Sequence, residues 1–307
     1  MISPDLDTVA VSRPSYLCGL IGSGISKSLT PPLHEAEGRA QGVGYVYRIL
    51  DLDTLALGED ALPRLLASAK LLGFDGLNIT HPCKQAVIPL LDDLSGDART
   101  LGAVNTVHIA NGRLIGHNTD WSGFARNMDE GLGGAPTDRV VQLGAGGAGA
   151  AVAYAALTRG VLHFTIIDAD ATRAQLLRDS LAAMFPDRVI VSGDLSAVPA
   201  AVGQAQGLIN ATPLGMAQHP GMALDAELLR PDLWVADVVY RPAETELLRR
   251  ARDIGARTLS GIGMAVGQAV DSFRIFTGLE PDSLRMQEHM RRLLAEEDSA
   301  TLAASPS

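Results

Sequence analysis

A glycine-rich hexapeptide near the middle of the chain constrains the fold more than any other feature of the sequence. Residues 144–149 read Gly-Ala-Gly-Gly-Ala-Gly, between the apolar segment 139–143 and a run rich in alanine. A strand, a glycine turn and a helix in this order begin a βαβ unit. A second apolar segment, 163–167, ends at Asp168, about 20 residues beyond the last glycine. The pattern therefore predicts a doubly wound parallel sheet in the second half of the chain.

The hexapeptide also predicts a dinucleotide site. Gly144 permits the tight turn, Gly146 lets the backbone approach a pyrophosphate, and Gly149 lets the helix pack on the strand. The unpaired N–H groups and the positive dipole end of the helix favour phosphate binding. A turn of small residues without a ligand is the alternative interpretation. We expect the cofactor to bind at the loop and at the acidic residue after the next strand: Gly144, Ala145, Gly146, Gly147, Ala148, Gly149 and Asp168.

Asp168 further predicts which dinucleotide binds. Its carboxylate can accept hydrogen bonds from the adenosine ribose hydroxyls, whereas it would repel the 2′-phosphate of NADP. Residues 168–172 contain no arginine to bind that phosphate, and Arg173 falls inside the next predicted helix. We therefore expect NAD, with Asp168 and Arg173 beside its adenosine ribose.

Length and the order of the apolar segments predict two α/β domains. The 307 residues exceed what one hydrophobic core normally accommodates, about 250–300 residues. The first half also alternates strand-like and helix-like segments, which favours parallel sheets in both halves. We expect an N-terminal α/β domain from residue 16 to 120, a Rossmann-like NAD-binding domain at 121–261, and flexible tails at 1–15 and 296–307.

Periodicity, turn residues and caps predict the individual elements. Asn111-Gly112 is expected to close a hairpin, Thr30 to cap a helix, and residues 131–138 to link the domains. The predicted strands are 16–21, 45–50, 74–79, 104–109, 114–115, 140–143, 163–167, 189–191, 208–211 and 234–237. The predicted helices are 32–41, 62–72, 84–91, 122–131, 147–158, 172–184, 244–254, 264–276 and 283–294.

The composition argues against several classes of protein. The formal net charge is −10 and Lys and Arg form no cluster, so no nucleic-acid partner is expected. No run approaches the about 18–20 apolar residues of a membrane span, and the N-terminal residues lack the apolar core of a signal peptide. Cys18 and Cys83 are expected to be free thiols in a reducing cytosol, which predicts a cytoplasmic protein.

Polar residues follow three predicted strands of the first half, in segments 78–84, 102–106 and 116–120. Ligands of open α/β sheets bind outside the carboxyl ends of the strands. A Lys–Asp pair there can carry the proton of an alcohol while its carbon loses hydride, so Lys84 and Asp120 are the candidate catalytic residues. A solvated residue at a helix N-terminus and a plain helix N-cap are the alternatives for them. No His, Cys or Asp cluster has metal-ligand spacing, and no metal is expected.

These segments resemble the shikimate/quinate dehydrogenase family, over about residues 17–285. The resemblance implies a two-domain enzyme that oxidises a ring hydroxyl of a small hydroxylated cyclic carboxylic acid. It also implies that the last helices, from about Met264, return to pack on the first domain, so that residues 16–120 with 262–295 form a substrate-binding domain and a cleft separates it from the NAD-binding domain. The segments that carry it are 26–31, 78–84, 102–106, 116–120, 144–149, 210–216, 237–242 and 263–268.

The resemblance implies a role for each matching residue. Lys84 and Asp120 match the catalytic pair, and Ser28 and Thr30 match the hydroxyls that hold the substrate carboxylate. The residues that match contacts to the ring hydroxyls are Thr80, Asn105 and Gln268. The residues that match the nicotinamide side of the cofactor site are Asn210, Thr212, Tyr240 and Gly263.

Some positions depart from the common pattern of the family. Cys83 stands where an aromatic residue often precedes the lysine, and Gly267 is small just before Gln268. Residues 168–170 read Asp-Ala-Asp where the NADP-dependent biosynthetic members usually carry Asn-Arg-Thr, which agrees with NAD. Thr30 in place of serine, and the run 34–38, resemble the quinate/shikimate subgroup.

The sequence thus predicts an NAD-dependent enzyme that oxidises quinate or shikimate to the 3-dehydro acid. The nearest alternative is an NADP-dependent biosynthetic shikimate dehydrogenase that reduces 3-dehydroshikimate. A methylenetetrahydrofolate dehydrogenase, an NAD-sensing regulator without catalysis, and a dehydrogenase for an amino analogue of the acid also stay open. A homodimer is one candidate for the oligomeric state.

Overall fold

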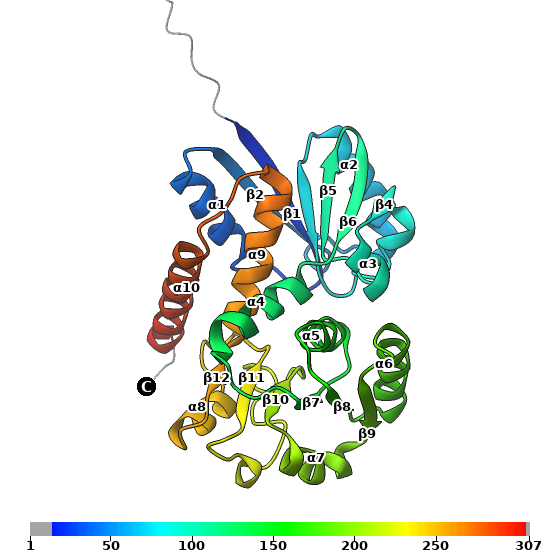
Figure 1. Ribbon diagram of the computed structural model, residues 1–307. Coiled ribbons are helices and arrows are strands. Elements are labelled where there is room, and N and C mark those ends of the chain that lie inside the picture. The colour runs from blue at the N-terminus through cyan, green and yellow to red at the C-terminus, as the bar shows by residue number, and fades with distance from the viewer. Residues whose placement is uncertain (1–13, 305–307) are drawn as a thin grey trace, which may run out of the picture.

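The computed structural model describes residues 14–304, and these form two six-stranded sheets with helices on their faces (Figure 1). The strands are β1 (Ser15–Gly22), β2 (Gly44–Asp51), β3 (Gly76–Ile79), β4 (Asp93–Leu94), β5 (Thr106–Ala110), β6 (Arg113–His117), β7 (Arg139–Leu143), β8 (His163–Ile167), β9 (Val189–Gly193), β10 (Gly207–Asn210), β11 (Trp234–Asp237) and β12 (Thr258–Leu259). The α-helices are α1 (Thr30–Ala40), α2 (Leu62–Leu71), α3 (Gly96–Leu101), α4 (Asp120–Leu132), α5 (Gly147–Thr158), α6 (Ala171–Met184), α7 (Val198–Gln204), α8 (Glu246–Asp253), α9 (Gly261–Thr277) and α10 (Ser283–Ala304).

The second sheet is parallel throughout and confirms the prediction made from the glycine loop. Its order is β12-β11-β10-β7-β8-β9: the chain runs outward from β7 through β8 to β9 and then continues from β10 on the other side of β7. This is the strand order of a doubly wound dinucleotide-binding sheet. The glycine loop joins β7 to α5 and therefore lies at the switch point, where ligands of such sheets bind.

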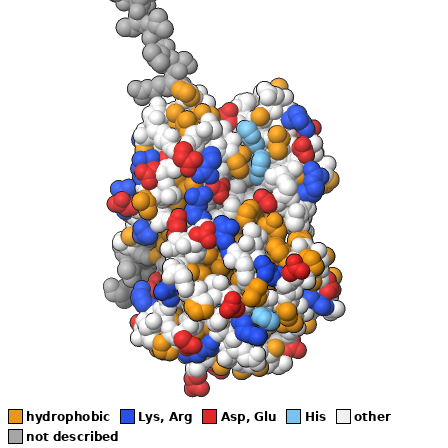
Figure 2. Space-filling view, viewed as in Figure 1, with side chains coloured by type: hydrophobic (Ala, Val, Ile, Leu, Met, Phe, Trp, Pro, Cys, Tyr) orange, Lys and Arg blue, Asp and Glu red, His pale blue; other side chains and the backbone are white. Residues whose placement is uncertain are grey.

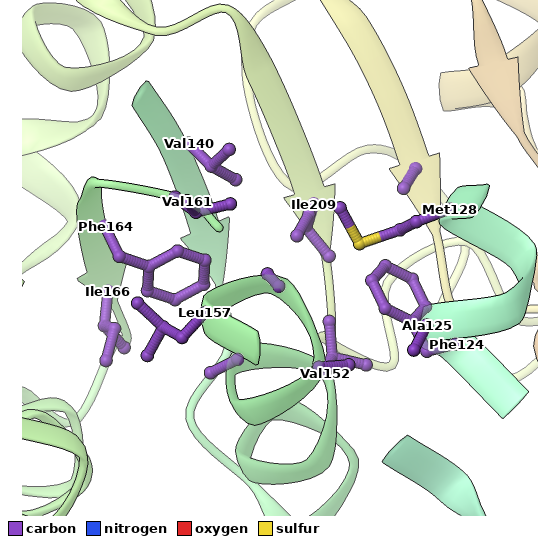
Figure 3. Packing of buried hydrophobic residues seen from close by; sticks show 14 of the residues in the cluster. Phe124, Ala125, Met128, Val140, Val152, Leu157, Val161, Phe164, Ile166 and Ile209 are labelled. Atoms are coloured by element: carbon purple, nitrogen blue, oxygen red, sulfur yellow. The ribbon is translucent and has the colours of Figure 1, made fainter. Parts of the chain in front are cut away.

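Helices α4, α5 and α6 cover one face of the second sheet, and α7 and α8 cover the other. Figure 3 shows Phe164 and Ile166 of β8 packed with Leu157 of α5. Each large apolar side chain buried in this way contributes about 1.5–3 kcal/mol. The many alanines of α5 keep this helix close to the sheet, and so fix the position of the loop at its N-terminus.

The first sheet is mixed, so the prediction of parallel sheets in both halves is wrong for this half. Its order is β2-β1-β3-β5-β6-β4, and β5 runs antiparallel to both β3 and β6. The cause is the predicted hairpin: Asn111 and Gly112 both have positive φ (50° and 73°), as a tight hairpin turn requires. Strand β4 and helix α3 after it were not predicted.

Two local predictions in the first half are also wrong. Residues 84–91 form turns and a short 3-10 helix, Ile88–Leu90, instead of an α-helix. Thr30 is the first residue of α1 and not its cap, since the N-cap position is Leu29 and makes no side-chain cap bond. Of the linker predicted at 131–138, residues 133–138 lie outside helices and strands and connect α4 to β7, while α4 extends to Leu132.

Helix α9 returns from the second half and packs against the first sheet, as the resemblance implied. Phe276 of α9 would touch any Cβ at Gly76 of β3. Helix α9 also crosses α4 closely, because a Cβ at Gly267 would lie 2.7 Å from Cα of Gly123. The glycine at 267, unexplained by the sequence, therefore permits the crossing of the two helices that lie between the sheets in Figure 1.

The last described element is α10, which is longer than predicted. It extends to Ala304, so residues 296–304 of the expected tail are helical, while residues 1–13 and 305–307 lie outside the described part of the chain. Acidic and basic side chains are interspersed on the face shown in Figure 2. No helix within residues 14–304 is long and apolar enough to cross a membrane.

Candidate active site

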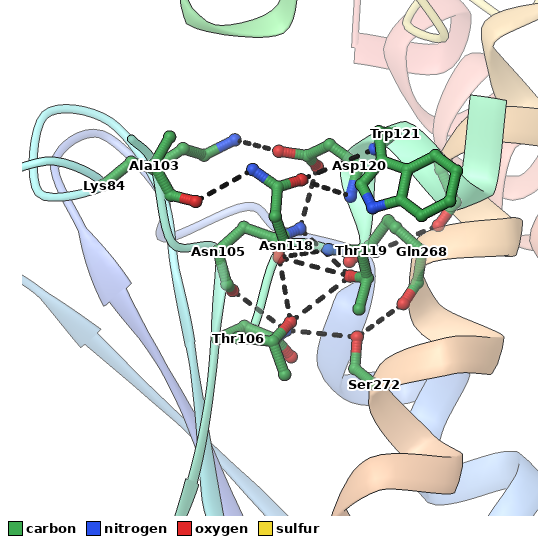
Figure 4. A network of polar contacts seen from close by, with 12 residues as sticks. Lys84, Ala103, Asn105, Thr106, Asn118, Thr119, Asp120, Trp121, Gln268 and Ser272 are labelled. Carbon is green, nitrogen blue, oxygen red and sulfur yellow. Dashed lines mark hydrogen bonds and ion pairs between the residues drawn. The ribbon is translucent and has the colours of Figure 1, made fainter. Parts of the chain in front are cut away.

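The structure brings Lys84 and Asp120 together at the carboxyl end of the first sheet (Figure 4). Lys84 lies in the turn after β3, and Asp120 is the first residue of α4, after β6. Lys84 Nζ donates to Asp120 Oδ2 across 2.6 Å, and the two side chains are 24% and 13% exposed. The site therefore contains a partly buried ion pair, with its ammonium still reachable from solvent.

Asp120 is held from behind by Asn105. The Nδ2 of Asn105 donates to Asp120 Oδ1 (2.9 Å) and to Thr119 Oγ1 (3.0 Å). Its Oδ1 accepts from Thr119 N (2.7 Å) and from Thr106 Oγ1 (3.0 Å). Asn105 is buried with both N–H groups paired, so it restricts the orientation of the Asp120 carboxylate.

Asp120 is not the helix N-cap that the sequence left as an alternative. The N-cap position is Thr119, which makes no side-chain cap bond, and Oδ1 of the preceding Asn118 accepts from Asp120 N at 3.1 Å. The Nδ2 of Asn118 donates to Ala103 O at 3.0 Å, which ties the start of α4 to the loop before β5. The carboxylate of Asp120 is thereby left for Lys84 and Asn105.

A buried polar network, which the sequence did not predict, continues from Asn105 toward α9. Asn78 Nδ2 donates to Thr106 Oγ1 (3.0 Å) and to Ser272 Oγ of α9 (3.2 Å). Asn78 Oδ1 accepts from Tyr47 OH at 2.6 Å. Unpaired polar groups in a core are costly, so this paired network makes the region behind the ion pair rigid. In the sequence, the only sign of this network is that polar residues occur within segments predicted as strands.

Ser28 and Thr30 lie at the start of α1, and their hydroxyls face each other. Ser28 Oγ donates to Thr30 Oγ1 (3.1 Å) and accepts from Thr30 N (3.3 Å). Thr80 follows β3 directly and is half-buried, and its N–H donates to Ile21 O of β1. Gln268 of α9 is half-buried as well, with Nε2 bonded to Ala265 O (2.9 Å).

Cys83, the residue before the lysine, points into the core of the first half. It is fully buried, and burial raises the pKa of its thiol to about 11. Cys18 is buried too, and both cysteines are free, as predicted. The cysteine that stands where the family often has an aromatic residue is thus a core residue, next in the chain to Lys84.

The glycine loop has the geometry that a pyrophosphate needs. Gly144 has φ +99°, and a Cβ there would lie 2.6 Å from Ala211 O, so only glycine fits. Helix α5 begins at Gly147 with no side-chain cap on its N–H groups. Gly146 and Gly147 are exposed, and a Cβ at either would meet nothing within 4 Å. Unpaired N–H groups at an open helix N-terminus fit a dinucleotide phosphate.

Asp168 is buried at the end of β8 and is bonded to the loop. Its Oδ2 accepts from Ala145 N (2.7 Å) and its Oδ1 from Asp170 N (2.8 Å). Arg173 lies in α6, as predicted, with Nη1 3.7 Å from Asp168 Oδ1. One carboxylate therefore orders the loop and faces a guanidinium.

Gln142 of β7 is a further support of the loop that the sequence did not reveal. It is fully buried, and its Nε2 donates to Gly144 O (2.8 Å) and Gly149 O (3.0 Å). One side chain thus fixes both ends of the loop.

Asn210 and Thr212 lie together after β10. Asn210 Oδ1 accepts from Thr212 Oγ1 (2.7 Å), and its Nδ2 donates to Asp237 Oδ1 (2.9 Å). Burial raises the pKa of the Asp237 carboxyl to about 6.

Tyr240 packs on the cluster that joins α1, α9 and α10. Gly263 faces α4, where a Cβ would collide with Asn127 Oδ1, so packing alone requires this glycine.

Among residues 14–304, no group of three or more His, Cys, Asp or Glu side chains could hold a metal ion. What the two halves offer instead is an open dinucleotide loop and a partly buried Lys–Asp ion pair, each at the carboxyl end of its own sheet. A protein of this class is a dehydrogenase that depends on a nicotinamide dinucleotide.

Comparisons with known proteins give the family. Residues 20–107 match the shikimate dehydrogenase substrate binding domain, and residues 261–294 match the shikimate 5′-dehydrogenase C-terminal domain. A shikimate dehydrogenase (NADP(+)) of Pseudarthrobacter chlorophenolicus is 54% identical, covering 93% of this chain and 98% of that one. A quinate/shikimate dehydrogenase (NAD(+)) of Corynebacterium glutamicum strain R is 55% identical, covering 89% and 97%.

Solved structures agree with the sequence relatives. The quinate dehydrogenase from Corynebacterium glutamicum in complex with NAD superposes with a TM-score of 0.87 at 52% identity, covering 91% of this chain and all of that one. The chain belongs to the shikimate dehydrogenase family, and it is an oxidoreductase of the shikimate/quinate dehydrogenase type. Relatives of nearly equal identity are named for different cofactors, so overall identity does not discriminate between NAD and NADP.

Proposed function

We propose that the protein oxidises the ring hydroxyl of quinate and shikimate to the 3-dehydro acid, with NAD as the cofactor. Residues 16–120 with 262–295 would bind the acid, and residues 121–261 would bind NAD. The observation that carries the proposal is the 2.6 Å ion pair of Lys84 and Asp120, in a chain that also has an open dinucleotide loop. A regulator that only binds NAD needs no proton transfer, and therefore does not need this ion pair.

In this proposal Lys84 carries the proton. As an amine it accepts the proton of the ring hydroxyl, and Asp120 stabilises the ammonium that forms. NAD, when bound, supplies the acceptor for the hydride of the same carbon. Asn105 keeps the carboxylate aimed at Lys84, which removes an orientational cost from the step. In the reverse direction the ammonium returns the proton.

The acid is held by hydroxyl and amide groups. Ser28 and Thr30 donate to its carboxylate, which accepts several hydrogen bonds. Thr80, Asn105 and Gln268 contact the ring hydroxyls. Without substrate, the amide group of Asn105 donates one hydrogen bond to Thr119 Oγ1 and one to Asp120 Oδ1. One of these two bonds must therefore break before Asn105 can donate to a ring hydroxyl. An amino group on the ring could use the same contacts.

The adenosine half of NAD is assigned to the loop and the end of β8. The pyrophosphate binds at Gly144, Ala145, Gly146, Gly147, Ala148 and Gly149, and the ribose hydroxyls at Asp168 with Arg173 beside it. Asp168 repels a 2′-phosphate because its carboxylate is nearly buried, where charge is weakly screened. Asn210, Thr212, Tyr240 and Gly263 line the nicotinamide side.

One observation favours NADP as the second candidate. Arg173 Nη atoms lie 3.7 Å from both Asp168 and Asp170, so a guanidinium is already beside the ribose position and could bind a 2′-phosphate. The relatives named for NADP at 54% identity point the same way. We favour NAD because Arg173 here is paired by two carboxylates.

Initial rates with quinate and with shikimate, each with NAD and with NADP, test the proposal. We expect turnover of both acids with NAD, and a kcat/KM at least about tenfold lower with NADP. Turnover confined to shikimate and NADP would contradict the cofactor assignment and identify the biosynthetic enzyme. No turnover in any combination would contradict the substrate assignment.

A further inference from the structure

A buried carboxylate lies behind the loop that leads to Ser28. Asp51, the last residue of β2, is 5% exposed. Its Oδ1 accepts from the backbone N–H of Gly24 (3.1 Å), and its Oδ2 accepts from that of Ile25 (3.0 Å). The hydroxyl of Ser26 also donates to Oδ2. Three consecutive residues of the loop therefore donate to one side chain.

Successive backbone N–H groups aimed at one point form a site for an anion. In this loop the protein's own carboxylate occupies that site. The hydrogen bond from Ser26 holds the pKa of the Asp51 carboxyl below its usual value, against the effect of burial, and bonds from backbone N–H groups add to this. Asp51 is therefore an anion at neutral pH.

The hydrogen bonds continue from this loop to both parts of the proposed substrate site. Ser28 N donates to Ile25 O (2.9 Å), and Ser28 Oγ is bonded to Thr30 Oγ1 (3.1 Å). At the other end, Ser23 N donates to His81 O (2.9 Å), in the turn that carries the catalytic lysine. A change at Asp51 is thus transmitted to the hydroxyl pair through a single short segment, 23–28.

We infer that Asp51 is a positioning residue for the substrate carboxylate. It fixes the segment 23–28 so that Ser28 and Thr30 present their hydroxyls, and it occupies the N–H groups of Gly24 and Ile25 so that the acid is received by the hydroxyls alone. The inference rests on the proposed function, since it concerns how that function's substrate is held.

The test replaces Asp51 by Asn, which has the same shape but presents an NH₂ group where Ile25 and Ser26 need an acceptor. We expect KM for quinate and shikimate to rise at least about tenfold, while kcat changes by less than about threefold. KM for NAD stays at the wild-type value. Asp53→Asn is the matched control, because Asp53 is exposed and lies two residues further on, and it keeps wild-type kinetics.

Two further readouts separate positioning from general damage to the fold. A cyclohexanetriol without a carboxylate should inhibit wild type and Asp51→Asn with the same Ki. Hydrogen exchange at the amides of Gly24 and Ile25 should accelerate in the variant, while the strands of the first sheet stay protected. Should Asp51→Asn fail to fold, Ser26→Ala removes one bond to the same carboxylate and should raise KM for the acids by a smaller factor, with kcat retained.

The possible failures are distinguishable. A wild-type enzyme that oxidises neither acid with either cofactor refutes the proposed function and this inference with it. An active wild type beside a variant with wild-type KM for both acids refutes the inference alone. Equal losses toward the triol and the acids also overturn it, since the effect would then not concern the carboxylate.

Discussion

The ion pair of Lys84 and Asp120 predicts a specific pattern of kinetic losses. The two side chains meet at 2.6 Å and are mostly withdrawn from water. Replacement of Lys84 by Ala removes the group to which we assign the proton transfer, and we expect kcat to fall by about 100- to 10,000-fold. At about 1.4 kcal/mol per tenfold, this corresponds to about 3–5 kcal/mol of transition-state stabilisation.

Asp120→Asn should cause a loss of similar size without changing the shape of the site. The amide oxygen can keep the bond from Asn105, which leaves the NH₂ group facing Lys84 Nζ, donor against donor. The double variant should be no worse than Lys84→Ala, because residues that act as one unit do not contribute additively.

The assay is the initial rate of reduced-cofactor formation, with NAD affinity measured separately by quenching of protein fluorescence. Lys70→Ala, at an exposed lysine of α2, is the matched control and should keep wild-type rates. NAD affinity should stay unchanged in all variants. Wild-type turnover by Lys84→Ala, or losses that add in the double variant, would refute the assignment of the pair.

Four further predictions concern the cofactor site and stability. Asp168→Asn combined with Ala169→Arg should lower kcat/KM with NAD and raise it with NADP, since a 2′-phosphate loses a repelling carboxylate and gains a guanidinium; rates with both cofactors check this. Gln142→Leu removes the bonds to both ends of the glycine loop and should raise KM for NAD by about tenfold while KM for the acid stays constant. Gly267→Ala should destabilise the fold by about 1–3 kcal/mol in urea titrations, because its Cβ would enter the crossing of α4 and α9. Burial lowers the pKa of His34 from 6.5 to about 3. The free energy of unfolding should therefore fall as pH drops from 6.5 toward 3, by about 1.4 kcal/mol per pH unit relative to the His34→Gln variant. Equal pH dependence of the two proteins in urea titrations would contradict this.

Most of the second half of the fold was predictable from the sequence because its signals are local, although helix α7 and the short strand β12 were not predicted. The loop 144–149, the strand before it and the helix after it are adjacent in the chain, and the predicted helix 147–158 matches α5 residue for residue. The roles suggested for Gly144 and Gly149 correspond to close backbone contacts in the structure. The family motifs likewise identified Lys84 and Asp120, which lie 36 residues apart and meet in space.

The first half was harder because tertiary contacts decide its local structure. Residues 84–91 have helix-forming side chains, but the carbonyl of Lys84 accepts from Val104 N (2.9 Å), a bond that a helix would have used internally. Pro82 and Pro89 leave too few residues between them to nucleate a helix without such help. The partners of Asn78 include Ser272, 194 residues away, and no local pattern reveals a contact of that kind.

The most direct test of NAD-dependent ring oxidation is a competition between cofactors for one labelled substrate. Quinate and shikimate carrying deuterium on the carbon of the oxidised hydroxyl are each incubated with the enzyme and equal concentrations of NAD and NADP. Mass spectrometry of the reduced cofactors then shows where the deuteride went. We predict that deuterium appears predominantly in NADH with both acids, alongside the 3-dehydro product. Deuterium predominantly in NADPH, or in neither reduced cofactor, would contradict the proposed function.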